Sequence, residues 1–132
     1  MAIVIKMYDA KDFEQLISII ELEGDEWDYW KPEYREMYKS ALEKSITYVA
    51  WVDYEICGFS RSVDDFATEI IVCDLLVTPE HRSKDIGKEL LERIANDFPE
   101  KNVYVMSDVD EYYLKQGYVR VGSVIRITKA WI

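Results

Sequence analysis

Residues 70–98 read IIVCDLLVTPEHRSKDIGKELLERIANDF, and they decide how the rest of the chain is interpreted. The segment from Ile70 to Val77 is rich in β-branched and other apolar residues, and Pro79 follows it, which is typical of a buried strand. From Ile86 to Phe98 the apolar residues recur at helical spacing. The pattern therefore predicts a strand that leads into a helix through a short basic loop.

The junction between this strand and this helix has the features of an anion site. Arg82, Lys84 and Lys88 supply positive charge there. The first turn of a helix adds amide hydrogens without partners and a partial positive charge. We therefore expect the junction to bind an anion, most naturally a phosphate.

The composition of the chain limits its class and its partners. A length of 132 residues fits a single domain spanning 1–132, and an apolar content of 49% excludes general disorder. A formal charge of −10 argues against a nucleic-acid partner, because such a surface would need a basic face. No apolar run is long enough to span a membrane or to act as a signal peptide, so we expect a cytoplasmic protein without a membrane partner.

The two cysteines, Cys57 and Cys73, both lie inside apolar segments. We expect reduced thiols in the core, with neither a disulfide framework nor a metal site.

The remaining patterns predict the order of the elements. Three strands follow one another without an intervening helix before the central helix, at 46–52, 56–62 and 70–77. The other expected elements are a strand at 3–5, helices at 13–20 and from 32, a strand at 102–106, a short helix at 109–115 and strands at 118–121 and 124–132. We therefore expect an α/β (α+β) fold with a mixed, mostly antiparallel sheet of about six to seven strands and about four helices on its two faces.

The central stretch resembles the acyl-CoA signature of the GNAT superfamily of N-acetyltransferases, in which a strand of the form LxVxP precedes R/QxxGxG/A and a helix. The matching residues are Leu75, Val77, Pro79, Arg82 and Gly87. Asp85 replaces the first glycine of the pattern. Aspartate tolerates the left-handed backbone that glycine permits, but its charge lies beside the expected anion and opposes binding.

A second stretch, 112–122, reads YYLKQGYVRVG and resembles the GNAT pattern FYxKxGFxxVG. The resemblance implies that Tyr113 lies near the sulfur of CoA and protonates the departing thiolate, which is chemically reasonable for a phenol. The alternative is that Tyr113 only packs its helix. Asp108 stands near the place where the family often has an asparagine that contacts the CoA arm. The resemblance runs from about residue 46 to residue 122, and more loosely over the N-terminal helices.

The resemblance implies a GNAT-like acyl-CoA-binding domain that transfers an acetyl group directly from acetyl-CoA to an amine in a ternary complex, without a metal. Backbone amides of the strand would hold the pantetheine arm and the thioester oxygen. The loop and the start of the helix would hold the diphosphate. The residues concerned are Leu75, Leu76 and Val77 in the strand, and Arg82, Ser83, Lys84, Asp85, Ile86, Gly87 and Lys88 after it.

The base that deprotonates the amine is left open by the sequence. Asp74 and Glu69 are the carboxylates on the central strand, and a buried carboxylate can act as a base near neutral pH. Asp74 could equally be a structural residue that pairs with Arg61. A chain of water molecules is a third way to remove the proton.

An acidic and aromatic segment between the first two helices is the candidate acceptor site. Trp27, Tyr29 and Trp30 lie among Asp25, Glu26 and Asp28. Aromatic faces and carboxylates suit a primary amine or ammonium group. The alternative is that the aromatic residues cap the core while the carboxylates face water.

Three questions stay open at this level. The acceptor could be a polyamine, an aminoglycoside, an amino acid, or a protein N-terminus or lysine. The domain could also bind acyl-CoA without transferring it, as a sensor or an interaction module, and Asp85 supports that alternative. Finally, the late strands could mediate a homodimer, as is common in the family.

Overall fold

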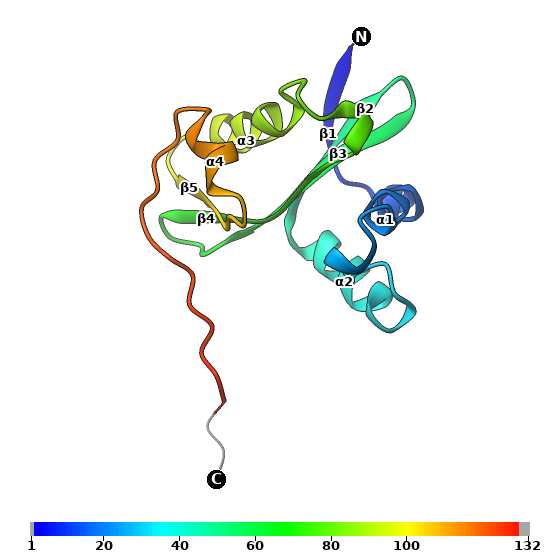
Figure 1. Ribbon diagram of the computed structural model, residues 1–132, viewed down its shortest axis with the longest axis horizontal. Coiled ribbons are helices and arrows are strands. Elements are labelled where there is room, and N and C mark those ends of the chain that lie inside the picture. The colour runs from blue at the N-terminus through cyan, green and yellow to red at the C-terminus, as the bar shows by residue number, and fades with distance from the viewer. Residues whose placement is uncertain (1, 130–132) are drawn as a thin grey trace.

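The computed structural model describes residues 2–129, and its framework is one five-stranded sheet (Figure 1). The strands lie side by side in the order β1-β2-β3-β4-β5. The pairs β1/β2, β2/β3 and β3/β4 are antiparallel, and β5 is parallel to β4. Their bounds are β1 (Ile3–Met7), β2 (Ile46–Val52), β3 (Glu55–Asp64), β4 (Glu69–Val77) and β5 (Asn102–Val105).

Helices cover both faces of the sheet. The longer ones are α1 (Phe13–Glu21), α2 (Pro32–Lys44) and α3 (Ile86–Asp97), and α4 (Asp110–Leu114) is short. There are also three turns of 3-10 helix. Ala10–Asp12 lies just before α1, Gly24–Glu26 lies after α1, and Pro79–His81 lies before α3. No helix in the described part of the chain is long and apolar enough to span a membrane.

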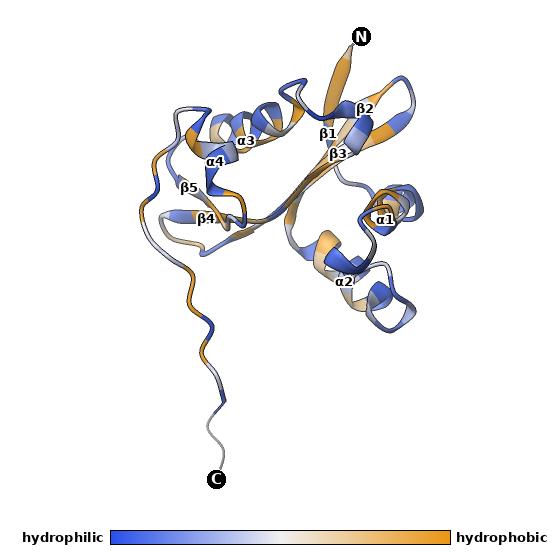
Figure 2. Cartoon of the chain, in the orientation of Figure 1, coloured by the Kyte–Doolittle hydropathy of each residue, from blue (hydrophilic) through white to orange (hydrophobic). Residues whose placement is uncertain are grey.

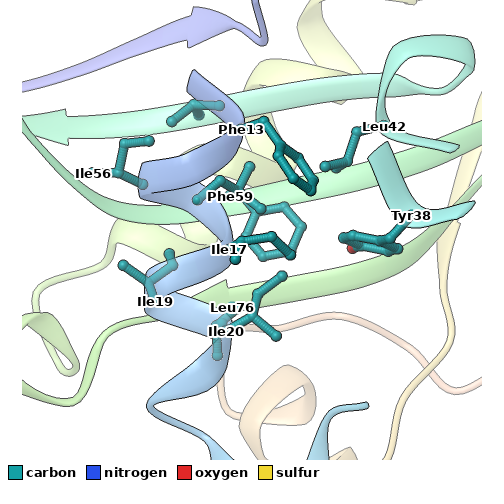
Figure 3. Packing of buried hydrophobic residues seen from close by; sticks show 11 residues of the cluster. Phe13, Ile17, Ile19, Ile20, Tyr38, Leu42, Ile56, Phe59 and Leu76 are labelled. Carbon is teal, nitrogen blue, oxygen red and sulfur yellow. The ribbon is translucent and has the colours of Figure 1, made fainter. Parts of the chain in front are cut away.

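One core lies between the sheet and the first two helices, as Figure 3 shows. Leu16 and Ile20 of α1 are completely buried against Phe59 of β3 and the neighbouring strands. Tyr38 and Leu42 of α2 close the same core. Their spacing of four residues places each pair on one side of its helix, which is why the predicted periodicity produces this layer.

The second core lies on the opposite face of the sheet, under α3. Leu90 and Ile94 are fully buried there against Ile70 and Val72 of β4. The strand that opens the central stretch is therefore covered on both faces, which explains its almost continuous apolar sequence.

A β-bulge in β4 changes which side chains face each core. Arg61 lies opposite Asp74 and Ser62 lies opposite Val72, so that Cys73 has no partner in β3. The extra residue places Asp74 on the face of α1 and α2, while Val72 and Leu75 both belong to the core under α3. The same place marks the end of the ladder with β5, which pairs only with Glu69–Val72.

The prediction of six to seven strands was wrong, because the sheet of the described residues has five. Residues 118–121 and 124–129 form no ladder with any described strand, and residues 130–132 of the predicted last strand lie outside the described residues. Alternating apolar residues favour an extended backbone, but a strand also needs a neighbour to pair with. The four predicted helices and the three consecutive strands before α3 are confirmed.

Candidate functional site

A groove of about 960 Å³ lies where β4 and β5 separate. One wall of the groove is formed by the last part of β4 and the loop that leads into α3. The segment between α1 and α2 and the residues around α4 form the rest of the lining. This volume is in the range of small-molecule and cofactor sites. The predicted site residues that line it are Trp27, Tyr29, Asp74, Leu75, Leu76, Val77, Arg82, Ser83, Asp85, Ile86, Gly87, Asp108 and Tyr113.

Beyond the bulge, one edge of β4 is open toward β5. The Thr78 amide donates to the Cys57 carbonyl at 2.9 Å, so this opposing pair is a hydrogen-bonded one. Hydrogen-bonded and non-bonded pairs alternate along an antiparallel ladder, so the main-chain groups of Leu75 and Val77 point away from β3. The Val77 carbonyl does accept a bond from the Arg82 Nε atom at 3.0 Å, which agrees with this direction.

The loop before α3 offers a run of main-chain donors. From Ser83 to Lys88, no backbone N–H group has an acceptor among the described residues, and the first bond into the helix runs from the Glu89 amide to the Asp85 carbonyl. Ser83 and Asp85 both adopt left-handed backbone, at φ values of 65° and 62°. Alternation of this kind gathers successive N–H groups into a concave anion site, here at the positive end of α3.

Gly87 allows α4 to close over this loop. A Cβ atom at residue 87 would lie 2.2 Å from the Tyr112 hydroxyl, which touches the start of α3. Tyr112 also packs edge-to-face on Tyr113, with ring centroids 5.0 Å apart. The absence of a side chain at this residue therefore brings both tyrosines of the second predicted signature to the groove.

The basic side chains of the loop do not all point at the predicted anion site. Arg82 forms an ion pair with Glu23 at 2.6 Å, in addition to its bond to the Val77 carbonyl. Its side chain therefore joins the end of β4 to the segment after α1. Lys84 and Lys88 do not line the groove. Arg82 lines the groove with its guanidinium engaged by Glu23, and the donors of the loop without an acceptor among the described residues are main-chain N–H groups.

Asp74 lies at the floor of the groove and is only 7% exposed. Its Oδ2 atom accepts from Arg61 Nε at 2.6 Å and from the Tyr38 hydroxyl at 2.8 Å. Tyr29 stacks on Tyr38 with centroids 4.0 Å apart, so the cluster reaches the groove wall. Burial and the nearby Asp74 charge raise the pKa of Tyr38, which keeps its hydroxyl a donor.

The structure thus shows the pairing of Asp74 with Arg61 that was one of the two interpretations of this carboxylate. Glu69, the other predicted base, lies at the start of β4, where its Oε1 atom accepts from the Thr68 hydroxyl. It does not line the groove. The two predicted bases are therefore not brought together.

The segment between α1 and α2 gives the groove an acidic and aromatic rim. Glu26, Trp27, Asp28 and Tyr29 line the groove, and the Trp27 and Tyr29 rings pack edge-to-face at 6.1 Å. Trp30 is turned into the protein instead, where its indole N–H donates to the Gly24 carbonyl at 3.0 Å. Trp27, Tyr29 and Trp30 all pack against the first core, and Trp27 and Tyr29 line the groove as well, so the binding of an amine by this segment stays a prediction.

Tyr113 lines the groove from α4 and is partly buried. Burial, with smaller contributions from Tyr112 and Asp108, raises the pKa of Tyr113 to about 12. The phenol therefore stays protonated throughout the neutral range. It can donate a hydrogen bond to a negatively charged atom in the groove.

Sequence reasoning missed several lining residues. Cys73 reaches the groove because it is the bulged residue, and Met106 and Gln116 reach it from the two sides of α4. The buried Gln116 Oε1 atom has no hydrogen-bond partner among the described residues. A bulge has no sequence signal of its own, whereas Gln116 stands beside the glycine of the second signature and could have been considered.

This arrangement combines two chemical environments. Main-chain donors line one side and suit an extended ligand that carries an anionic group. Carboxylates and aromatic rings line the other side and suit a cation. Among residues 2–129, no three metal-ligating side chains gather into a cluster.

Comparison with known proteins points to one family. The family model of the GNAT acetyltransferase domain matches residues 43–120, which is more than half of the chain. This range includes β2 to β5, α3 and α4, and therefore the whole wall of main-chain donors. Among curated protein sequences, none matches significantly.

Solved structures share the fold at low sequence identity. A GNAT-family acetyltransferase from Streptococcus pneumoniae is similar with a TM-score of 0.77 and 23% identity, over 98% of this chain and 100% of that one. AAC(6')-Iy, bound to a bisubstrate analogue of CoA and acetylneamine, is similar with a TM-score of 0.78 and 11% identity, over 99% of this chain and 100% of that one. An aminoglycoside acetyltransferase from an uncultured soil sample has a TM-score of 0.72 and 16% identity, over 99% of this chain and 100% of that one.

Proposed function

The chain belongs to the GNAT acetyltransferase family, and on that premise we propose that it is an N-acetyltransferase that moves an acetyl group from acetyl-CoA to a cationic amine. The observation that carries the proposal is the open edge of β4 beside the run of N–H groups from Ser83 to Lys88, in one groove. The pantetheine arm lies along the main chain of Leu75 and Val77. The diphosphate lies on the loop amides, where the α3 dipole stabilises it.

Direct transfer accounts for the chemistry without a further cofactor. The ammonium group of the acceptor first gives a proton to solvent or to a base, because only the neutral amine has a lone pair. Its nitrogen then attacks the thioester carbonyl, the carbon–sulfur bond breaks, and CoA leaves as a thiolate that takes up a proton. The nitrogen loses its second proton to solvent or to a base as the amide forms. Main-chain donors at the carbonyl oxygen stabilise the charge that develops there, and binding of both substrates in one groove supplies proximity.

Tyr113 is the proposed donor to the departing sulfur. Its raised pKa of about 12 makes it a weaker acid than a thiol, whose ordinary pKa is about 8.5. The phenol therefore stabilises the thiolate mainly as a hydrogen-bond donor. Full protonation of the sulfur is completed by water once CoA leaves.

The acceptor end of the groove favours a positively charged substrate. Asp74 uses only its Oδ2 atom for Arg61 and Tyr38, which leaves Oδ1 for an ammonium group. Tyr29 and Glu26 line the same groove and add an aromatic face and a second carboxylate. The similarity to aminoglycoside acetyltransferases agrees with a polycationic acceptor, so we propose this class and assign Asp74 to acceptor binding.

The second candidate is a protein of the same fold that binds acyl-CoA without transferring it. Asp85 favours this alternative, since its carboxylate lies at the start of α3 among the amides that would hold the diphosphate.

A reducing compartment suits either function, because Cys57 and Cys73 are both free thiols, and we propose a cytoplasmic location.

The release of free thiol from acetyl-CoA tests the proposal. The full chain is mixed with acetyl-CoA and either an aminoglycoside, a polyamine, a lysine peptide or no amine. We expect thiol release that depends on a polycationic amine. Binding of acetyl-CoA without amine-dependent release would establish the sensor instead, and absence of both would refute the shared CoA site.

Two tyrosine variants make the test specific. Tyr113→Phe removes the proposed donor, and we expect turnover to slow by roughly one to two orders of magnitude, which corresponds to the loss of one hydrogen bond to a charged atom, while the affinity for acetyl-CoA is unchanged. Tyr34→Phe is the matched control, since Tyr34 lies on α2 and does not line the groove. Equal turnover by the two variants would remove Tyr113 from the mechanism.

A further inference from the structure

The Arg82 side chain joins the two sides of the groove. Its Nε atom donates to the Val77 carbonyl at 3.0 Å, and its Nη2 atom donates to Glu23 Oε1 at 2.6 Å. Val77 is the last residue of β4, whereas Glu23 lies in the segment between α1 and α2. Figure 2 shows hydrophilic colours along this segment and along the loop before α3. One side chain therefore connects the wall proposed for the cofactor with the rim proposed for the acceptor.

The charged side chains that line the groove are mostly acidic. The lining carboxylates belong to Glu23, Glu26, Asp28, Asp74, Asp85 and Asp108. Among the lining residues of the described chain, Arg82 is the one lysine or arginine. An anion that enters the groove therefore competes with Glu23 for this guanidinium.

The two partners of this ion pair differ in their freedom to move. The Arg82 side chain is 50% exposed, and the Glu23 side chain is 14% exposed. The main chain around Glu23 is fixed, because the Glu23 amide donates to the Ile20 carbonyl at 2.9 Å and the Trp30 indole donates to the Gly24 carbonyl at 3.0 Å. A half-exposed arginine side chain changes its rotamer without any movement of the main chain. Arg82 is therefore the partner that can leave, while Glu23 stays in the groove.

The place of Arg82 in the chain lets a bound diphosphate attract its side chain. Arg82 directly precedes Ser83, where the run of N–H groups without an acceptor among the described residues begins. A guanidinium binds phosphate oxygens through two parallel hydrogen bonds. Its bond to Glu23 uses one carboxylate oxygen, and partly exposed ion pairs contribute little to stability. A diphosphate on the loop amides is therefore able to replace Glu23 as the partner of Arg82.

Glu23 becomes a site for a cation once Arg82 has left. A carboxylate that is 14% exposed and has lost its partner is poorly solvated, so a new cation stabilises it. Trp27 and Tyr29 line the same groove and offer aromatic faces to an ammonium group. The acceptor end of the groove thus gains a carboxylate at the moment when the cofactor is in place.

We propose that Glu23 is a second acceptor-binding carboxylate, which Arg82 covers in the free protein and releases when the diphosphate of acetyl-CoA takes its guanidinium. The inference rests on the proposed function, because it needs both a CoA cofactor and a cationic acceptor. By linkage, each of the two ligands strengthens the binding of the other by the same factor. We expect a factor of about five, the lower end of typical coupling between sites, because the ion pair is partly exposed.

The affinity for CoA tests whether Glu23 holds Arg82 back. CoA lacks the acetyl group and cannot react, so calorimetric titration of the full chain measures binding alone. Glu23→Gln removes the competing charge, and we expect CoA to bind about fivefold more tightly. Glu21→Gln removes the same charge two residues away, from an exposed side chain that does not line the groove, and should change the affinity much less. Equal CoA affinities of these two variants would overturn the proposal.

The affinity for the aminoglycoside neamine tests whether the release of Glu23 favours a cation. In the unmodified protein, saturating CoA should tighten neamine binding about fivefold, and Glu23→Gln should abolish this gain. Arg82→Gln leaves Glu23 uncovered, so this variant should bind neamine without CoA as tightly as the unmodified protein does with CoA. A neamine affinity that CoA does not raise, or a gain that survives Glu23→Gln, would overturn the proposal.

The same measurements separate this proposal from the proposed function. CoA binding and amine-dependent thiol release, with the same coupling in Glu23→Gln as in the unmodified protein, would overturn the role of Glu23 alone. Absence of CoA binding in all four proteins would refute the shared CoA site and this inference with it. Far-ultraviolet circular dichroism should be the same for the four proteins, which shows that the variants fold.

Discussion

The buried cluster of Asp74, Arg61 and Tyr38 allows a test that separates its role in the fold from its role in the groove. The side chains of Arg61 and Asp74 are 15% and 8% exposed, and their contact is 2.6 Å. Asp74→Ala removes the acceptor of both other residues. Breaking a buried ion pair costs about 3–5 kcal/mol, because the remaining charge has no partner. We therefore expect the free energy of unfolding to fall by this amount, a large part of the total stability of a small domain.

Replacing the whole cluster should recover most of that loss. In the triple variant Arg61→Met, Asp74→Leu, Tyr38→Phe, no buried polar group of the cluster is left without a partner. Apolar replacements of buried ion pairs are often neutral or stabilising, so we expect stability within about 1–2 kcal/mol of the unmodified protein. The triple variant should nevertheless lose its affinity for a cationic acceptor, because it lacks the Asp74 carboxylate, while its affinity for acetyl-CoA is unchanged.

Urea unfolding followed by tryptophan fluorescence measures the stabilities, and calorimetric titration measures the two affinities. Tyr38→Phe alone is an intermediate control and should cost about 1.5–3 kcal/mol, the value of one hydrogen bond to a charged group. A loss of less than about 1 kcal/mol for Asp74→Ala would refute the structural role, since roughly 3 kcal/mol is the least expected of a broken buried pair. Acceptor binding by the triple variant at unchanged affinity would refute the role in the groove.

Three further predictions concern the strands, the loop and the tyrosines. Gly58→Ala should lower stability by about 2 kcal/mol in urea unfolding, because its Cβ would lie 2.8 Å from the Leu76 carbonyl oxygen, whereas Gly122→Ala, with nothing within 4 Å, should not. Asp85→Gly should tighten acetyl-CoA binding about fivefold in calorimetry, because it removes a carboxylate near the diphosphate. Ser83→Gly also places glycine at a residue with left-handed backbone but changes no charge, so it should improve the affinity less than about fivefold. Melting temperatures should fall as the pH rises above about 10, because unfolded tyrosines ionise near pH 10 while Tyr113 keeps its proton to about 12, and Tyr113→Phe should reduce this part of the fall.

The order of elements could be predicted from the sequence because periodicity and turn residues are local signals. The strand at 70–77 and the helix from Ile86 follow from spacing alone, and the left-handed backbone of Asp85 follows from the glycine it replaces. The left-handed backbone of Ser83 had no such signal. The late strands failed for a different reason, since alternation specifies an extended chain but not the neighbour that would pair with it.

The site was predictable where main-chain groups form it and not where long-range contacts decide. Leu75 and Val77 reach the groove because the strand direction fixes their orientation. Arg82 turns to Glu23, which is 59 residues away in the sequence, and Trp30 turns inward against the first core, which α1, α2 and the sheet form together. Neither contact could be read from local composition. Both depend on how the segment after α1 packs against the rest of the protein.

Titration of the isotopically labelled protein with acetyl-CoA, followed through its amide NMR signals, tests the central claim most directly. The account predicts saturable shifts that are largest at the amides of Ser83 to Lys88 and at Leu75 and Val77, with small shifts in α1 and β1. Saturable shifts that gather on another face would contradict the account. So would the absence of shifts up to millimolar acetyl-CoA, because a dissociation constant of about 1 mM corresponds to a binding free energy of only about −4 kcal/mol.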